Sequence, residues 1–196
     1  MPRLECCGEE QHLFDKLEVG TKWVSKNLAC LFVGESPGSL GSPHFYTPIP
    51  EYKSDPIEVR RYLLPALSHK KIISSPSLEA FRDKGFLFDH TIRCQLATQI
   101  IENERTLARK HMSRLAHAAR HLIPLLNEAP KVWIIGFIAL DAVTHFSQDN
   151  LTYIEEIPKE GRIINQKYFL SHYLRRFDSH EKIQTIVDRF ESFLIA

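Results

Sequence analysis

Cysteine is scarce in this chain of 196 residues, which has four, at positions 6, 7, 30 and 94. Adjacent cysteines such as Cys6 and Cys7 make a poor disulfide framework, so we expect reduced thiols. No apolar run approaches the ~20 residues that a membrane span requires. The first ten residues, MPRLECCGEE, contain no apolar signal region, which argues against secretion. We therefore expect a cytoplasmic protein without a membrane segment.

An excess of charge of either sign is also lacking. The 25 Lys and Arg residues nearly balance 24 Asp and Glu residues, and the formal net charge is +1. Any surface that binds nucleic acid must therefore be local. The chain has no internal repeat and no low-complexity tract, and its length suits one domain with a real core. We expect a single domain over residues 1–196, with residues 1–27 as an N-terminal helical segment.

Short apolar runs alternate with helical patterns along the chain. Strands are expected at residues 28–33, 86–94 with a trailing loop, 131–135 and 163–170. Helices are expected at residues 9–26, 57–67, 77–84, 103–127, 136–146 and 179–194. Residues 148–161 fit either a hairpin or a loop. Strands that alternate with helices imply a parallel sheet covered on both faces. The predicted fold is therefore α/β, a three-layer α/β/α arrangement with a mainly parallel four-stranded central sheet.

The stretch from Leu28 to Pro50 carries the strongest local signal. Its apolar run ends in GESPG, where two glycines and a proline force a sharp turn. This places Glu35 at the carboxyl end of a predicted strand, where open α/β sheets bind ligands. Phe45 and Tyr46 follow between prolines, which are stiff enough to hold rings as a fixed wall. We interpret the stretch as one side of a pocket, although an ordinary turn with a solvated glutamate fits the same spacing.

Four segments resemble, in the same order, motifs of the uracil-DNA glycosylase superfamily, particularly the prokaryotic branch with a GEAPG or GEGPG first motif. They are LFVGESPGS, FLFDHTIRC, KVWIIGFIALDAV and KYFLSHYLRRF. The likeness covers most of the chain from Leu28 onward. It implies a uracil-DNA glycosylase-like fold and a role in base-excision repair. Such enzymes flip a damaged base out of DNA, because its target atom is unreachable inside the stack, and hydrolyse its bond to the sugar.

The resemblance also implies roles for individual residues. Glu35 would orient the attacking water or stabilise the cationic sugar, and His172 would stabilise negative charge on the departing base. Phe45 is the best match for the ring that stacks on the base, and Tyr46 is the second. The other candidates are Ser36, Asp89 and His90 for base binding, and Arg175 and Arg176 for DNA phosphates.

Two positions depart from the family pattern. The asparagine that reads the base edge falls on His90, and an imidazole places its donor and acceptor differently from an amide. The identity of the excised base is therefore open. Alignment of the last motif puts the family's histidine on Leu170, so His172 serves only if the loop is shorter. A structural role for His172, capping a carbonyl group, fits the sequence nearly as well.

The cysteines do not match the iron–sulfur ligands of the cluster-bearing members. Those members use a Cys-x-x-Cys pair and two later cysteines. Here Cys94 matches the third ligand, Cys6 and Cys7 are adjacent, and His111 stands near the fourth position. Clusters are generally held by four thiolates at set spacings, so we expect neither a cluster nor another cofactor or metal. Cys30, inside the first predicted strand, is expected in the core.

The leading hypothesis is a hydrolase that cleaves the N-glycosidic bond of uracil or another deaminated base in single- or double-stranded DNA. A non-catalytic protein of the same fold that binds a nucleobase, nucleotide or DNA is the alternative, and an enzyme acting on a small nucleobase compound is a third. We expect Glu35, Phe45, His90 and His172 to converge at the carboxyl ends of the strands. A basic stripe on the predicted long helix could follow phosphates, but a solvated helix face explains it better. The stripe consists of Lys110, Arg114, His117 and His121.

Overall fold

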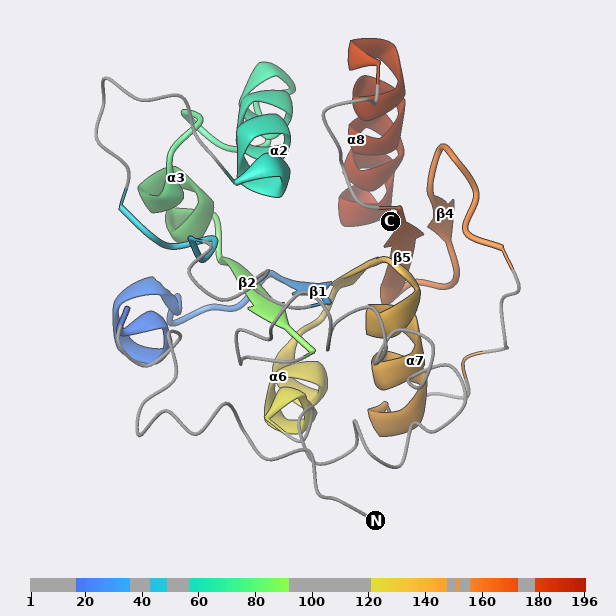
Figure 1. Cartoon of the computed structure of the whole chain (residues 1–196), viewed down its shortest axis with the longest axis horizontal. Coiled ribbons are helices and arrows are strands. Elements are labelled where there is room, and N and C mark those ends of the chain that lie inside the picture. The colour runs from blue at the N-terminus through green and yellow to red at the C-terminus, as the bar shows by residue number, and fades with distance from the viewer. Residues whose placement is uncertain are drawn as a thin grey trace.

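The computed structural model has an α/β architecture with a five-stranded sheet between two layers of helices (Figure 1). It describes residues 17–35, 43–48, 57–91, 121–147, 151, 156–172 and 179–196. The strands are β1 (Cys30–Gly34), β2 (Phe86–His90), β3 (Val132–Ile135), β4 (Arg162–Ile163) and β5 (Tyr168–Ser171). The helices are η1 (Val19–Trp23), α2 (Glu58–His69), α3 (Leu78–Asp83), α6 (Leu122–Glu128), α7 (Phe137–Phe146) and α8 (His180–Ile195).

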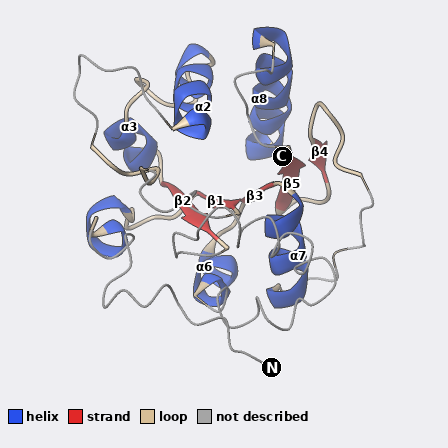
Figure 2. Ribbon diagram, in the orientation of Figure 1, coloured by secondary structure: helices blue, strands red, loops and turns tan. Residues whose placement is uncertain are grey.

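The strand order in the sheet is β2-β1-β3-β5-β4. The first four strands of this order are parallel, and β4 pairs antiparallel with β5 at the edge. Figure 2 shows α2, α3 and α8 on one face of the sheet, and α6 and α7 on the other. The three-layer α/β/α prediction is therefore confirmed in general form.

The predicted strand at residues 163–170 is wrong, because this segment forms a hairpin of two strands. The side-chain carbonyl oxygen of Asn165 accepts hydrogen bonds from the backbone N–H groups of Lys167 at 2.8 Å and Tyr168 at 3.0 Å. Asparagine commonly reverses the chain in this way. The sheet consequently has five strands rather than the four that were predicted.

The structure describes only part of two predicted helices. Within the predicted helix at residues 9–26, the described part contains only η1, a five-residue π-helix. Glu18, just before it, has φ 52°, a left-handed conformation that a right-handed helix cannot continue through. Of the predicted helix at residues 103–127, the structure describes the segment from His121 onward, where α6 begins at Leu122.

The remaining helices and strands lie close to their predicted positions. Gly136 is the N-cap of α7, as expected, and the helix ends at Phe146. Ser77 and Ser179 cap α3 and α8, accepting hydrogen bonds from the backbone N–H groups of Ala80 and Lys182. Such serine caps satisfy donors that a helix leaves unpaired at its start.

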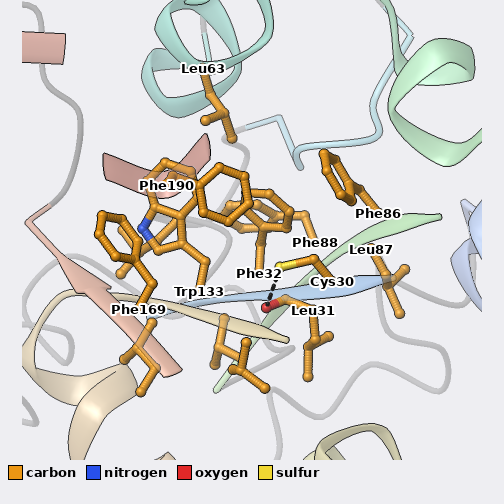
Figure 3. Close-up of a cluster of buried hydrophobic side chains, with 14 of the residues drawn as sticks. Cys30, Leu31, Phe32, Leu63, Phe86, Leu87, Phe88, Trp133, Phe169 and Phe190 are labelled. Atoms are coloured by element: carbon orange, nitrogen blue, oxygen red, sulfur yellow. Dashed lines mark hydrogen bonds between the residues drawn. The ribbon is translucent and has the colours of Figure 1, made fainter. Parts of the chain in front are cut away.

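One face of the sheet carries a row of aromatic side chains across four parallel strands. Phe88, Phe32, Trp133 and Phe169 are neighbours in register on β2, β1, β3 and β5. Figure 3 shows these rings gathered with Phe190 of α8 above the sheet. The Phe32 ring centroid lies 5.2 Å from that of Trp133, and Trp133 lies 4.3 Å from Phe190. This aromatic row and α8 form the centre of the core.

The opposite face is aliphatic and packs against α7. Leu31 and Val33 alternate with Phe32 along β1, so their side chains point to the other side of the sheet. Ala139, Ala142 and Val143 of α7 are buried, and small residues let this helix lie close to the strands. No helix in the described part of the chain has the length and apolar character needed to cross a membrane.

Candidate functional site

The residues that directly follow the strands form a row just beyond the carboxyl edge of the sheet. Gly34 pairs with His90, Val33 with Ile134, and Ile135 with Ser171. Continued to the end of each strand, this register puts Thr91, Glu35, Gly136 and His172 at one level. We call these four residues the edge row. Adjacent strands lie ~4.8 Å apart, so the backbones of Glu35 and His172 are about 10 Å apart with Gly136 between them.

The edge row crosses the point where the sheet reverses its winding direction. After β1 the chain leads to β2 on one side, and after β3 it leads to β4 and β5 on the opposite side. The connections therefore diverge between the ends of β1 and β3, which is where open parallel sheets bind ligands. Glu35 follows β1 at this point and is 9% exposed. The carboxylate thus occupies the position in the fold that the sequence predicted for it.

The N-terminus of α7 lies in the middle of the edge row. Gly136 has φ 90°, a left-handed conformation that suits glycine, and its N–H donates to the Ser171 carbonyl oxygen at 2.9 Å. The first bond within the helix runs from the Leu140 N–H to the Gly136 oxygen at 3.1 Å. The preceding N–H groups of the first turn have no partner within the helix, and they give its start partial positive charge. Anionic groups are favoured there.

His172 ends the edge row on β5. Its ring centroid lies 6.4 Å from that of Phe137, the first residue of α7, at an interplanar angle of 77°. Leu170, the other position suggested by the last motif, is buried within β5 and pairs with Ile134. Only His172 of these two lies beyond the sheet edge. Phe137 was not singled out from the sequence, although it comes only two residues after the end of β3.

The end of β2 carries a buried carboxylate and a network of hydrogen bonds. Asp89 is fully buried, and its Oδ1 accepts a hydrogen bond from the His90 backbone N–H at 2.7 Å. Nε2 of His121 lies 2.8 Å from the His90 carbonyl oxygen and 3.7 Å from Oδ2 of Asp89. Thr91 donates from both its N–H and its hydroxyl to the Gly34 oxygen, at 2.8 and 3.0 Å. The two Thr91 bonds join the ends of β1 and β2.

His121 therefore differs from its prediction. The sequence favoured a solvated helix face, but the His121 side chain is 18% exposed and turned toward Asp89. The helical spacing gave no sign of this arrangement, because the hydrogen-bond partner of His121, the His90 carbonyl oxygen, lies 31 residues away on another element. The rest of the basic stripe falls outside the described residues.

Phe45 lies in the core, contrary to the expectation of a ring that lines an open pocket. Its side chain is 2% exposed and stacks on Phe88, with centroids 4.4 Å apart and an interplanar angle of 11°. One face of the Phe45 ring is therefore covered by a protein side chain. In this arrangement a base could stack on that face only if Phe88 moved.

Tyr46 is likewise buried, and it closes the outer edge of β2. Its hydroxyl oxygen accepts a hydrogen bond from the Phe88 backbone N–H at 2.7 Å. Trp23 stacks on the Tyr46 ring with centroids 5.4 Å apart. Burial raises the pKa of the Tyr46 hydroxyl well above its ordinary value, so this group remains protonated.

The loop that holds these rings is fixed from two sides. On α2, the buried guanidinium of Arg60 donates to the carbonyl oxygens of Phe45 at 2.6 Å and Thr47 at 2.9 Å. Nδ1 of the buried His44 accepts a hydrogen bond from the Tyr46 N–H at 3.3 Å. The His44 ring lies 4.9 Å from that of His90, so the loop reaches the end of β2. Nothing in the sequence signalled the contact between Arg60 and the loop.

Several predicted residues fall outside the described ranges. These are Ser36, Arg175 and Arg176 of the predicted site, and Cys6, Cys7, Cys94 and His111 of the cluster question. Cys30 is confirmed as a core residue, and burial raises the pKa of its thiol. Across the described ranges, no group of three or more His, Cys, Asp or Glu side chains is arranged to hold a metal ion.

A scan against models of known protein families found none that matches this chain, and a search of curated proteins found no match either.

Proposed function

We propose that this protein is a DNA glycosylase-like hydrolase that cleaves the N-glycosidic bond of a deaminated base flipped out of DNA. The observation that carries the proposal is the edge row, in which Glu35 and His172 flank the N-terminus of α7 in register. A carboxylate, a helix N-terminus and an imidazole are the groups that this reaction needs. The first stabilises positive charge on the sugar, and the other two stabilise negative charge on the base.

The hydrolysis divides among these groups as follows. A water oxygen forms a bond to C1′ of the sugar as the C1′–N bond breaks, and the bonding electron pair leaves with the base. Glu35 orients the water and accepts its proton. The N–H groups at the start of α7 and the ring of His172 stabilise the anionic base until it takes up a proton.

Base recognition is assigned to the end of β2. The His90 ring lies 3.4 Å from the place where a side chain on Gly34 would begin, so it lies beside the backbone that leads to Glu35. Asp89 supports this residue through the His90 N–H. Phe137, half-buried at the start of α7, is a second aromatic ring available beside the edge row.

A non-catalytic protein that binds a nucleobase is the second candidate. The packing of Phe88 against Phe45 favours it, because the ring expected to hold a flipped base is already covered. A domain that retained the fold and the polar edge, but no longer accommodated an extruded base, would have this arrangement.

Strand cleavage after alkali, with oligonucleotides carrying uracil, hypoxanthine, xanthine or oxidised bases, tests the proposal. The Glu35→Gln variant keeps the side-chain size and removes the charge. We expect turnover to fall by roughly 10²-fold or more, with little change in DNA binding, since one acid–base group contributes about this much. Glu79→Gln in the first turn of α3 is the matched control and should leave turnover unchanged.

Two results would reject the proposal. One is a wild-type protein without activity on any of these oligonucleotides, together with nucleobase binding, which would establish the binding protein instead. The other is an active wild-type protein whose Glu35→Gln variant is equally active. Salt dependence then separates the ligands, because DNA binding weakens steeply with salt and binding of a neutral nucleobase does not.

A further inference from the structure

The residue that ends β2 has both of its backbone polar groups held by side chains. The N–H of His90 donates to Oδ1 of Asp89 at 2.7 Å, and its carbonyl oxygen lies 2.8 Å from Nε2 of His121. We propose that His121 is a positioning residue, which fixes the direction of the base-reading His90 through the His90 backbone. This inference rests on the proposed function, because the direction of His90 matters for recognition only if a base binds beside it.

The bonding partners determine which His121 nitrogen carries a hydrogen. A carbonyl oxygen can only accept, so Nε2 of His121 must be the donor in its contact with His90. The same Nε2 lies 3.7 Å from Oδ2 of Asp89, whose Oδ1 already receives the His90 N–H. The three residues therefore form a closed ring of polar contacts that holds the two peptide groups on either side of the His90 Cα. A buried carboxylate within that ring makes its geometry costly to disturb.

The backbone of His90 controls where its imidazole points. His90 is the last residue of β2, and the peptide group that follows it is held from two directions: the Thr91 N–H donates to the Gly34 oxygen at 2.8 Å, and the His90 carbonyl oxygen accepts from Nε2 of His121 at 2.8 Å. Its ring lies against Gly34, where an added Cβ would be 3.4 Å from Cδ2 of His90. It also lies 4.9 Å from the ring of His44. A rotation of the His90 peptide would move the imidazole out of this narrow space, and a shift of ~1 Å can cost roughly 10²-fold in rate.

His121 reaches this position from a separate element. It directly precedes α6 and is 31 residues from His90 in the sequence. Its side chain is mostly buried, whereas the Asp89 carboxylate is fully buried. The contact thus connects the start of α6 to the strand end that carries the base-reading residue.

The test replaces His121 in two ways and follows both activity and His90 itself. In His121→Gln the amide nitrogen can take the place of Nε2 and still donate, whereas His121→Leu removes the donor. We expect kcat/KM on the preferred oligonucleotide to fall by about 10- to 100-fold in His121→Leu and to stay within about threefold in His121→Gln. His69→Leu, at an exposed position in the last turn of α2, is the matched control and should have no effect.

An NMR measurement separates this inference from the proposed function. The imidazole resonances of His90 should shift in His121→Leu and return close to their wild-type positions in His121→Gln. If the wild type has no glycosylase activity, this pattern still supports positioning by His121, and the missing activity counts against the proposed function alone. An unchanged His90 signal in His121→Leu, or equal activity of that variant in an active protein, would overturn the inference.

A third variant covers the case in which His121→Leu fails to fold. His121→Asn is polar but too short to bring its amide to the Nε2 position. We therefore expect His121→Asn to show the same loss of activity and the same shift of the His90 resonances as His121→Leu. If the Asn and Gln variants are indistinguishable in both measurements, the position of the donor is irrelevant and the inference is wrong.

Discussion

The aromatic row and the edge row lie on the same strands, and only a few residues separate them. Phe32 and Trp133 occupy the middle of β1 and β3, where both rings are fully buried among aromatic side chains and the Trp133 Nε1–H donates to the buried Ser171 hydroxyl at 2.8 Å. Three residues further along each strand stand Glu35 and Gly136, where the pairing ends and polar groups begin. The two rows differ in their environment. Helix α8 covers the centres of the strands, whereas the strand ends lie beside the N-terminus of α7.

Mutations in the aromatic row and in the edge row should have different consequences. A side chain in the aromatic row contributes to the free energy of folding, because its removal leaves a cavity. A side chain in the edge row is expected to contribute to binding or catalysis. Its polar groups would lower the free energy of unfolding if they were buried deeper in the sheet. Phe45 was predicted from the sequence to line the pocket, but the structure places it in the core.

The largest expected effect tests that placement of Phe45. Phe45→Ala should lower the free energy of unfolding by about 3–5 kcal/mol, as should the matched variant Phe32→Ala, because both rings are buried among aromatic neighbours. Unfolding in urea followed by circular dichroism measures both. If the unfolding free energy of Phe45→Ala falls by less than about 1 kcal/mol while nucleobase binding is lost, Phe45 acts as a binding residue with the edge row and not as part of the core.

A smaller effect is expected from the hydroxyl group that closes the edge of β2. Tyr46→Phe removes the oxygen that accepts the Phe88 N–H, and leaving a buried donor unsatisfied costs about 1–3 kcal/mol. The same denaturation measurement should show no more than about 0.5 kcal/mol for Tyr62→Phe, a half-buried tyrosine on α2. Equal losses in the two variants would mean that water or a shifted loop replaces the lost acceptor.

The smallest expected effect is a change in the free energy of unfolding with pH, and it concerns Cys30, beside the aromatic row. Burial raises the pKa of its thiol above the ordinary value of 9.0, so the folded protein keeps the proton that the unfolded chain loses. Stability from this source is complete below pH 9 and is lost as the pH rises further. The wild type should therefore lose up to about 1.4 kcal/mol per pH unit more than Cys30→Ala above pH 9. Denaturation midpoints at pH 8, 9, 10 and 11 measure the difference; parallel curves would contradict the burial of the thiol.

Local patterns were sufficient to predict most of the elements. The first residues of α7 and α8 follow from the N-caps Gly136 and Ser179, because capping depends on the residue at one position and its immediate neighbours. Period and apolar content likewise identified β1, β2 and β3. The hairpin of β4 and β5 was missed because the apolar run hides a turn, and the Asn165 side chain that makes the turn was not recognised.

By itself the sequence determined the alternation of strands and helices and the position of Glu35 directly after β1, since both depend on contacts between near neighbours in the chain. The tertiary structure alone decided what those residues meet. It buried Phe45 against Phe88, set Arg60 against the carbonyl groups of its loop, and brought His121 to Asp89. These contacts join different elements of the chain, and they depend on the strand order β2-β1-β3-β5-β4 and on side-chain packing, which leave no periodic trace in the sequence.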